Sequence, residues 1–296
     1  MAYNTIEELR QIANHQGSPL WKPILDNEIE LSECSEKDVF ARLEVRYEVM
    51  EQSAGRALEK GLTTAGGLIE GISCTQYAYS KKDHSICGSF LNRLMARALS
   101  GSEVNAAMGK ICACPTAGAC GILPAVIISL EEKYQLERRT VLEGILTASG
   151  IGATITQNAT VSGAEGGCQA ECGVAAAMAA AAAAQMSGGT NDMAVNACCF
   201  ALMNAMGLIC DPVAGLVQVP CAQRNASQAV NAVLSADLAL AGMVSIIPAD
   251  EVIDAMFKVG RMLPMQLKET AQGGIAATPT GKEIKNHIFQ KQRGEK

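Results

Sequence analysis

The sequence predicts an all-α protein, a compact bundle of buried, alanine-rich helices joined by glycine-rich loops. Three observations support this fold class. Apolar residues recur at helical spacing, runs that alternate β-branched and polar residues are scarce, and aromatic residues make up only 4% of the chain. Hydrophobic residues form 49% of the 296 residues, which is enough for a large core without disulfide bonds. We expect a single domain over residues 1–296.

The N-terminal part carries more charge than the rest, and residues 1–61 are expected to form a helical arm. Within it, residues 35–61 have helical spacing. Ser35 is expected to cap this helix, because an acidic residue follows three positions later, and Gly61 is expected to end it. Residues 62–74 contain several glycines and are expected to be a linker.

Further helices are expected along the rest of the chain. The predicted ranges are 4–16, 86–110, 121–135, 138–149, 172–187, 191–207, 226–243 and 249–260. The run at 172–185 is almost entirely alanine, too short and too weakly apolar to span a bilayer, so a tightly packed buried helix is expected there. Residues 282–296 have the composition of a solvated helix.

The charge balance limits the partners. Lys and Arg total 24 against 30 Asp and Glu, and a net charge of −6 argues against nucleic acid or an anionic membrane as the main partner. The N-terminus lacks a basic segment followed by an apolar run, so no signal peptide is expected and a cytoplasmic location is predicted.

Twelve cysteines are more than packing requires in a reducing compartment, so some are expected to be metal ligands or reactive thiols. Paired C-x2-C zinc knuckles and ferredoxin-type cysteine runs are absent, and only three histidines occur. Three thiols lie in glycine-rich loops with the spacing C-x41-C-x10-C: Cys168, Cys210 and Cys221. The spacing alone does not select these three, and a disulfide, a metal site or buried thiols all remain open for the last two.

Four loops rich in small residues separate the predicted helices, at residues 112–121, 160–173, 210–221 and 270–281. Such loops bring backbone N–H groups close to a small anion, and binding sites on rigid scaffolds are commonly placed on them. These loops are therefore the candidate site.

The same loops carry a family resemblance. Residues 103–124, 162–173, 207–226, 250–256 and 273–281 resemble the α subunit of iron–sulfur-dependent L-serine dehydratase. The resemblance implies a helical lyase that converts L-serine to pyruvate and ammonia, with a role in amino-acid degradation and gluconeogenesis. It also implies a [4Fe-4S] cluster held by Cys168, Cys210 and Cys221, no pyridoxal phosphate, and a separate β subunit as partner.

Residues of the small-residue loops are candidates for binding the substrate. Hydroxyls and backbone N–H groups of two loops are expected to hold the substrate carboxylate, and two asparagines are expected to add hydrogen bonds. The candidates are Thr116, Ala117, Gly118, Ser162, Gly163, Asn105 and Asn158. The alternative is that these loops only cap helices.

The catalytic base is the least determined residue. Glu165 and Glu171 flank Cys168, and desolvation near a cluster would raise the pKa of either carboxylate. Lys110, His84 and a residue of the β subunit are further candidates.

Other residues have competing interpretations. Cys172 is a rival ligand or a spare thiol, while Cys112, Cys114 and Cys120 are expected to pack and to be liable to oxidation. Ile72 stands where the family pattern suggests an acid.

The alternative functions are the same chemistry on cysteine or threonine, a non-catalytic iron–sulfur module, and a structural zinc site.

Overall fold

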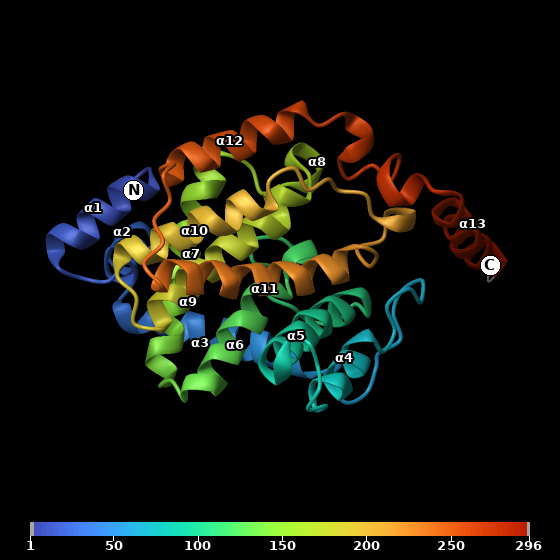
Figure 1. The fold of residues 1–296 in the computed structure, drawn as a ribbon, viewed down its shortest axis with the longest axis horizontal. Helices are drawn as coiled ribbons and strands as arrows, with labels where there is room; N and C mark the ends of the chain where they lie inside the picture. Colours follow the sequence, from blue (N-terminus) through green and yellow to red (C-terminus); the bar gives the residue numbers. More distant parts are fainter. Residues whose placement is uncertain (1–2, 295–296) are drawn as a thin grey trace.

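The computed structural model describes residues 3–294, with side chains described for residues 3–290 (Figure 1). The regular elements in this range are all helices, which confirms the predicted all-α fold class. The α-helices are α1 (Ile6–Gln16), α2 (Trp21–Ser32), α3 (Glu36–Gly55), α4 (Ile72–Ser80), α5 (Gly88–Ala106), α6 (Ile122–Tyr134), α7 (Arg138–Asn158), α8 (Gly163–Gly166), α9 (Val174–Met186), α10 (Asn191–Ala205), α11 (Cys221–Leu240), α12 (Ala249–Met262) and α13 (Pro279–Gly294). Short helical turns are η1 (Ala117–Ala119), η2 (Gln169–Gly173, a π-helix), η3 (Val213–Gly215), η4 (Met265–Leu267) and η5 (Gly274–Ala277).

The alanine-rich helix α9 is the centre of the core. It packs against α6, α7, α10 and α11, and each of its residues except Gln185 is buried. Small residues on the neighbouring helix allow this close approach, since a Cβ on Gly144 of α7 would lie 2.5 Å from Met186 Sδ. The predicted buried helix is thus observed. Among the described residues, no helix has both the length and the apolar character to cross a membrane.

The N-terminal helices belong to the same core. Ile6, Leu9 and Tyr47 are fully buried in the cluster that also contains α9. The start of α1 is held by Asp250 at the start of α12, whose carboxylate accepts hydrogen bonds from Ile6 N at 2.9 Å and Glu7 N at 3.1 Å. A carboxylate at a helix N-terminus also interacts favourably with the helix dipole.

The two ends of α3 show which helix boundaries the local sequence predicts correctly. Ser35 caps α3 in a reciprocal capping box, as predicted. The helix ends at Gly55 and not at Gly61. Gly61 serves a different purpose, because a Cβ there would lie 2.6 Å from Gly71 Cα, where the segment before α4 crosses it.

Four further helices differ from the predicted ranges. Helices α2 and α4 were not predicted, and α4 begins inside the expected linker. Helix α7 continues nine residues further, to Asn158, and α11 begins at Cys221 and not at residue 226. The earlier start of α11 matters for the site, because it places a thiol in the first turn of a helix.

Candidate metal and substrate site

Three elements bring Cys168, Cys210 and Cys221 together. Cys168 directly precedes the π-helix η2, Cys210 lies in the segment after α10, and Cys221 is the first residue of α11. Cys168 and Cys210 are each 3% exposed, and Cys221 is partly exposed. Burial and then the neighbouring Cys168 raise the pKa of Cys221 to about 12, and the pKa of Cys210 is raised by burial, Glu171 and Cys168. The three thiols therefore lie close enough for the charge of one thiolate to raise the pKa of another.

Backbone and amide hydrogen bonds fix the segment that carries Cys210. Cys210 N donates to Leu267 O at 2.9 Å. The Gln169 side chain, fully buried in η2, accepts from Gly207 N at 2.8 Å and donates to Met256 O at 3.0 Å. This amide connects the π-helix to the segment before Cys210 and to α12, so the two thiol-bearing segments are held in a defined relation.

A buried ion pair supports the same segment. Arg224 Nη2 lies 2.7 Å from Asp211 Oδ1, and Arg224 Nη1 donates to Ile209 O at 2.8 Å. Asp211 is 2% exposed and also accepts from Ile275 N at 2.7 Å. A Cβ at Gly274, which has φ +57°, would lie 2.1 Å from Asp211 Oδ2, so a glycine is needed there.

A fourth thiol lies beside the predicted three. Cys172 is buried, and its S–H stabilises the thiolate of Cys168, which lowers the pKa of Cys168; the nearby Arg224 guanidinium lowers it further. The pKa of Cys172 is raised, first by this hydrogen bond and then by burial. Cys172 is thus a close neighbour of the three, as its position four residues after Cys168 suggests.

Glu171 faces the same space. Its Oε2 lies 3.9 Å from Cys210 Sγ, and a Cβ at Gly163 would lie 2.5 Å from Oε2. A Cβ at Gly118 would lie 3.3 Å from Oε1. Burial, followed by the negative charge of Glu269, raises the pKa of Glu171 to about 7. One oxygen each of Glu171 and Glu269 and the Cys210 sulfur lie within 4.8 Å of one another.

The 112–118 loop supplies an unpaired polar atom. Thr116 Oγ1 is buried and has no hydrogen-bond partner among the described residues, although it lies close enough to Glu171 to act on the pKa of that carboxyl, in the lowering direction. Asn105 Nδ2 donates to Ala117 O at 3.2 Å, and Asn225 Nδ2 donates to Gly118 O at 2.7 Å. These amides hold the loop in place and leave the Thr116 hydroxyl free to bind another group.

Other predicted residues lie outside this group. Glu165 is exposed and accepts from Thr160 Oγ1 at 2.5 Å, while Ser162 occupies the N-cap position of α8. Asn158 Nδ2 donates to Asn4 O at 2.6 Å and to Thr154 O at 2.9 Å. In the part of the chain that the structure describes, neither Glu165 nor Asn158 forms a hydrogen bond with the four thiols or Glu171.

Three further residues of the sequence analysis are placed elsewhere. His84 and Lys110 are exposed. Ile72 is the first residue of α4 and packs against the small cluster that contains Ile69 and Leu99.

The comparison with known proteins agrees with the motifs. The model of the family described as "Serine dehydratase alpha chain" matches residues 15–276. The chain belongs to this family. It is 46% identical to "L-serine dehydratase, alpha chain" of Peptoniphilus asaccharolyticus, over 97% of this chain and 98% of the relative. It is 42% identical to "Probable L-serine dehydratase, alpha chain" of Bacillus subtilis, over 97% and 95%.

A longer relative is also similar to this member of the serine dehydratase alpha-chain family. "L-serine dehydratase TdcG" of Escherichia coli is 34% identical over 93% of this chain but only 61% of its own length. The family assignment confirms the resemblance predicted from the motifs.

Sequence reasoning missed four residues that build the site: Asp211, Arg224, Asn225 and Glu269. Asp211 follows Cys210 directly, and Arg224 and Asn225 lie three and four residues after Cys221, on the same helical face. A helix beginning at Cys221 would have indicated the last two. Nothing in the sequence near Glu269 indicates its approach to Glu171.

Proposed function

We propose that the chain is a lyase that deaminates L-serine to pyruvate and ammonia by β-elimination. The family assignment and the names of its relatives support this activity. The observation that carries the proposal is the convergence of three thiols, two of them buried and one partly exposed, beside the carboxylate of Glu171 and the unpaired hydroxyl of Thr116. Glu171 can accept a proton and the Thr116 hydroxyl can bind a carboxylate, and both lie next to thiols that can bind a soft metal.

The donor set fits a [4Fe-4S] cluster held by Cys168, Cys210 and Cys221. Thiolates are the usual ligands of such clusters, and sulfur donors select soft metals. Burial and mutual repulsion disfavour the thiolate forms of Cys210 and Cys221, so a bound cationic centre would stabilise them. When bound, the cluster supplies a Lewis-acidic iron without a protein thiolate, which stabilises charge that develops on a leaving hydroxyl.

The residues of the chain position the substrate and accept its proton. The Thr116 hydroxyl donates to the serine carboxylate, together with backbone N–H groups of Ala117, Gly118 and Gly163. Glu171 accepts the Cα proton, because it faces the thiols, while Glu165 is exposed and bound by Thr160. Loss of the hydroxyl then leaves aminoacrylate, which tautomerises to an imine that water hydrolyses to pyruvate and ammonia.

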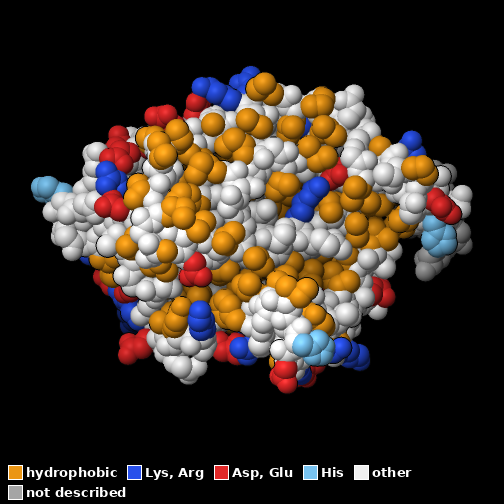
Figure 2. Space-filling view, in the orientation of Figure 1, with side chains coloured by type: hydrophobic (Ala, Val, Ile, Leu, Met, Phe, Trp, Pro, Cys, Tyr) orange, Lys and Arg blue, Asp and Glu red, His pale blue; other side chains and the backbone are white. Residues whose placement is uncertain are grey.

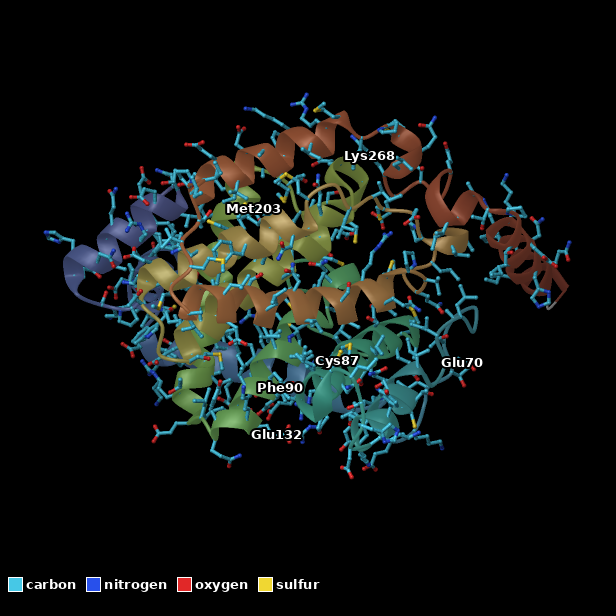
Figure 3. All side chains as sticks on the ribbon, in the orientation of Figure 1. Glu70, Cys87, Phe90, Glu132, Met203 and Lys268 are labelled. Carbon is cyan, nitrogen blue, oxygen red and sulfur yellow. The ribbon has the colours of Figure 1, made fainter. Side chains whose placement is uncertain are left out.

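A separate β subunit is proposed as the partner. Two relatives are named alpha chains, and TdcG has a further region that this chain does not match. Figure 2 shows hydrophobic side chains spread over the face formed by α10, α11 and α12. Exposed members there are Met203, Leu234 and Met262, and Met203 is labelled in Figure 3. This apolar surface supports a protein partner.

We also propose a cytoplasmic location. All twelve cysteines are free thiols, and so many unpaired thiols are typical of a reducing compartment.

The test is anaerobic reconstitution of the full chain with ferrous iron and sulfide, with and without a β subunit. Iron, sulfide and visible absorption report the cluster, and pyruvate formation from serine reports the activity. Cys34→Ser, a change at a partly exposed thiol outside the site, serves as control. Turnover of threonine or cysteine but not serine would overturn the substrate, and a colourless zinc-loaded protein would overturn the cluster.

A further inference from the structure

A cavity lies beside residues 112–115, the first part of the 112–118 loop. It has a volume of about 470 Å³ and is enclosed by α2, α3, α6, α7, α9 and the loop itself. Its floor is apolar, with Leu43, Leu123 and Ile145 among the lining residues. Cys112 and Cys114 both line it. These two thiols share a cavity whose lining does not include Glu171 or the thiols near it, so they form a separate site.

The two thiols differ in exposure. Cys114 is 6% exposed, and its Sγ lies 3.3 Å from the carbonyl oxygen of Cys112. Cys112 is partly exposed, so a small reagent reaches it first. The third thiol nearby, Cys120, is directed elsewhere, because its Sγ donates to Gly101 O at 3.5 Å. The geometry thus pairs Cys112 with Cys114 and leaves Cys120 apart.

We propose that Cys112 and Cys114 form a dithiol that peroxide oxidises reversibly to a disulfide. The thiolate of Cys112 attacks one oxygen of hydrogen peroxide, the O–O bond breaks, and sulfenic acid and hydroxide form. The sulfur of Cys114 then attacks the Cys112 sulfur, and the sulfenic oxygen leaves as water when it receives the Cys114 proton. Both cysteine sulfurs are oxidised, and peroxide is reduced to water.

The electrostatics support the order of these steps. The hydrogen bond from the Cys114 thiol, aided by the nearby Arg46, lowers the pKa of Cys112 to about 7 despite burial. The pKa of Cys114 is raised, first by that hydrogen bond and then by burial. Oxidation of Cys112 to a neutral sulfenic acid removes the charge that disfavours the Cys114 thiolate. The other charged groups at the cavity are Arg42 and Glu28.

The disulfide is within reach along the chain. Consecutive Cα atoms are about 3.8 Å apart, so cysteines separated by one residue lie within about 7.6 Å, close to the range of about 4.4–6.8 Å for disulfides. Formation of the bond requires the two Cα atoms to lie closer together than this upper limit. The loop also carries Thr116 and Gly118, so closing the bond is expected to shift the substrate side of the loop.

The test uses the anaerobically purified full chain treated with equimolar hydrogen peroxide at pH 7. Two free thiols are expected to disappear, peptide mapping is expected to locate a Cys112–Cys114 bond, and dithiothreitol is expected to restore both thiols. In Cys114→Ser, Cys112 is expected to accumulate as a sulfenic acid that dimedone traps. These readouts do not depend on the cluster, because mapping distinguishes Cys112 from the thiols near Glu171.

Cys87 provides the matched control, because it is exposed and precedes α5 (Figure 3). Cys87→Ser should form the Cys112–Cys114 bond as the unchanged chain does. Oxidation of Cys87 while Cys112 and Cys114 remain thiols would overturn the proposal. A bond from Cys112 to Cys120 would do the same.

Discussion

The carboxylate of Glu171 lies 3.9 Å from the sulfur of Cys210, in a space kept open by two glycines. Gly118 and Gly163 come from separate loops, and a Cβ at either position would approach this carboxylate. The π-helix η2 places Glu171 three residues after Cys168, so the proposed base and one proposed ligand are held by the same turn.

Glu171→Gln is expected to lower kcat for serine by about 10²–10⁴, the usual contribution of a positioned base. The substitution keeps the size and most hydrogen bonds of the side chain, so iron and sulfide content should not change. Glu165→Gln is the matched control and should retain near-normal activity, because that side chain is exposed. Steady-state pyruvate formation measures both variants, and equal losses would contradict the assignment of the base.

Gly163→Ala is expected to reduce activity at least tenfold. The added methyl group would lie 2.5 Å from Glu171 Oε2 and 3.3 Å from Cys210 Sγ, so the carboxylate must move. Gly55→Ala is the control, since a Cβ there meets nothing within 4 Å. It should leave activity unchanged and raise stability by up to about 1 kcal/mol, because alanine favours helix. Unimpaired turnover in Gly163→Ala would show that the carboxylate does not need its present position.

Asp211→Ala is expected to lower the free energy of unfolding by about 3–5 kcal/mol, because it leaves the Arg224 charge buried without its partner. Denaturant unfolding of the cluster-free chain measures this change. The exposed pair Lys258–Asp254 offers a comparison, and Asp254→Ala should change stability by less than about 1 kcal/mol. Similar values for the two variants would mean that Asp211 does not stabilise the segment around Cys210.

Alkylation of Cys112 is expected to depend on pH with a midpoint near 7. Because the thiolate is the reactive form, the rate should be near its maximum above the pKa and fall about tenfold for each pH unit well below it. Iodoacetamide labelling followed by peptide mapping gives the profile. In Cys114→Ser the midpoint should rise, since a serine hydroxyl replaces the thiol that stabilises the thiolate. An unchanged midpoint would assign the lowered pKa to another group, such as Arg46.

Much of the helical architecture was predictable, because periodicity and capping are local. Ser35 is an example, since its capping box depends on residues within one turn. The end of α3 was not predictable from Gly61, because that glycine is required by a contact with Gly71. Helix α4 was missed because the glycines just before it, such as Gly71, suggest a linker, whereas its start is held from outside the segment: the Glu103 carboxylate accepts hydrogen bonds from Gly71 N and Ser73 N.

Residues of the candidate site could be predicted only where they lie in a sequence motif of the family. Cys168, Cys210 and Cys221 were proposed as ligands through the family resemblance, and their thiols affect one another's pKa, but their role as ligands stays a prediction. Glu269 could not be identified, because its approach to Glu171 depends on how the chain after α12 returns to the site (Figure 3 labels the adjacent Lys268). Such a long-range approach leaves no periodic signal.

The central position of α9 reverses the usual expectation for alanine. On a protein surface, alanine is among the residues most readily exchanged. Along α9 nearly every face meets another helix, and the facing positions include glycines whose own Cβ would collide with Met178 or Met186. A larger side chain has no free volume, and glycine would weaken the helix. The simplest segment of the sequence is therefore expected to be among the slowest to diverge.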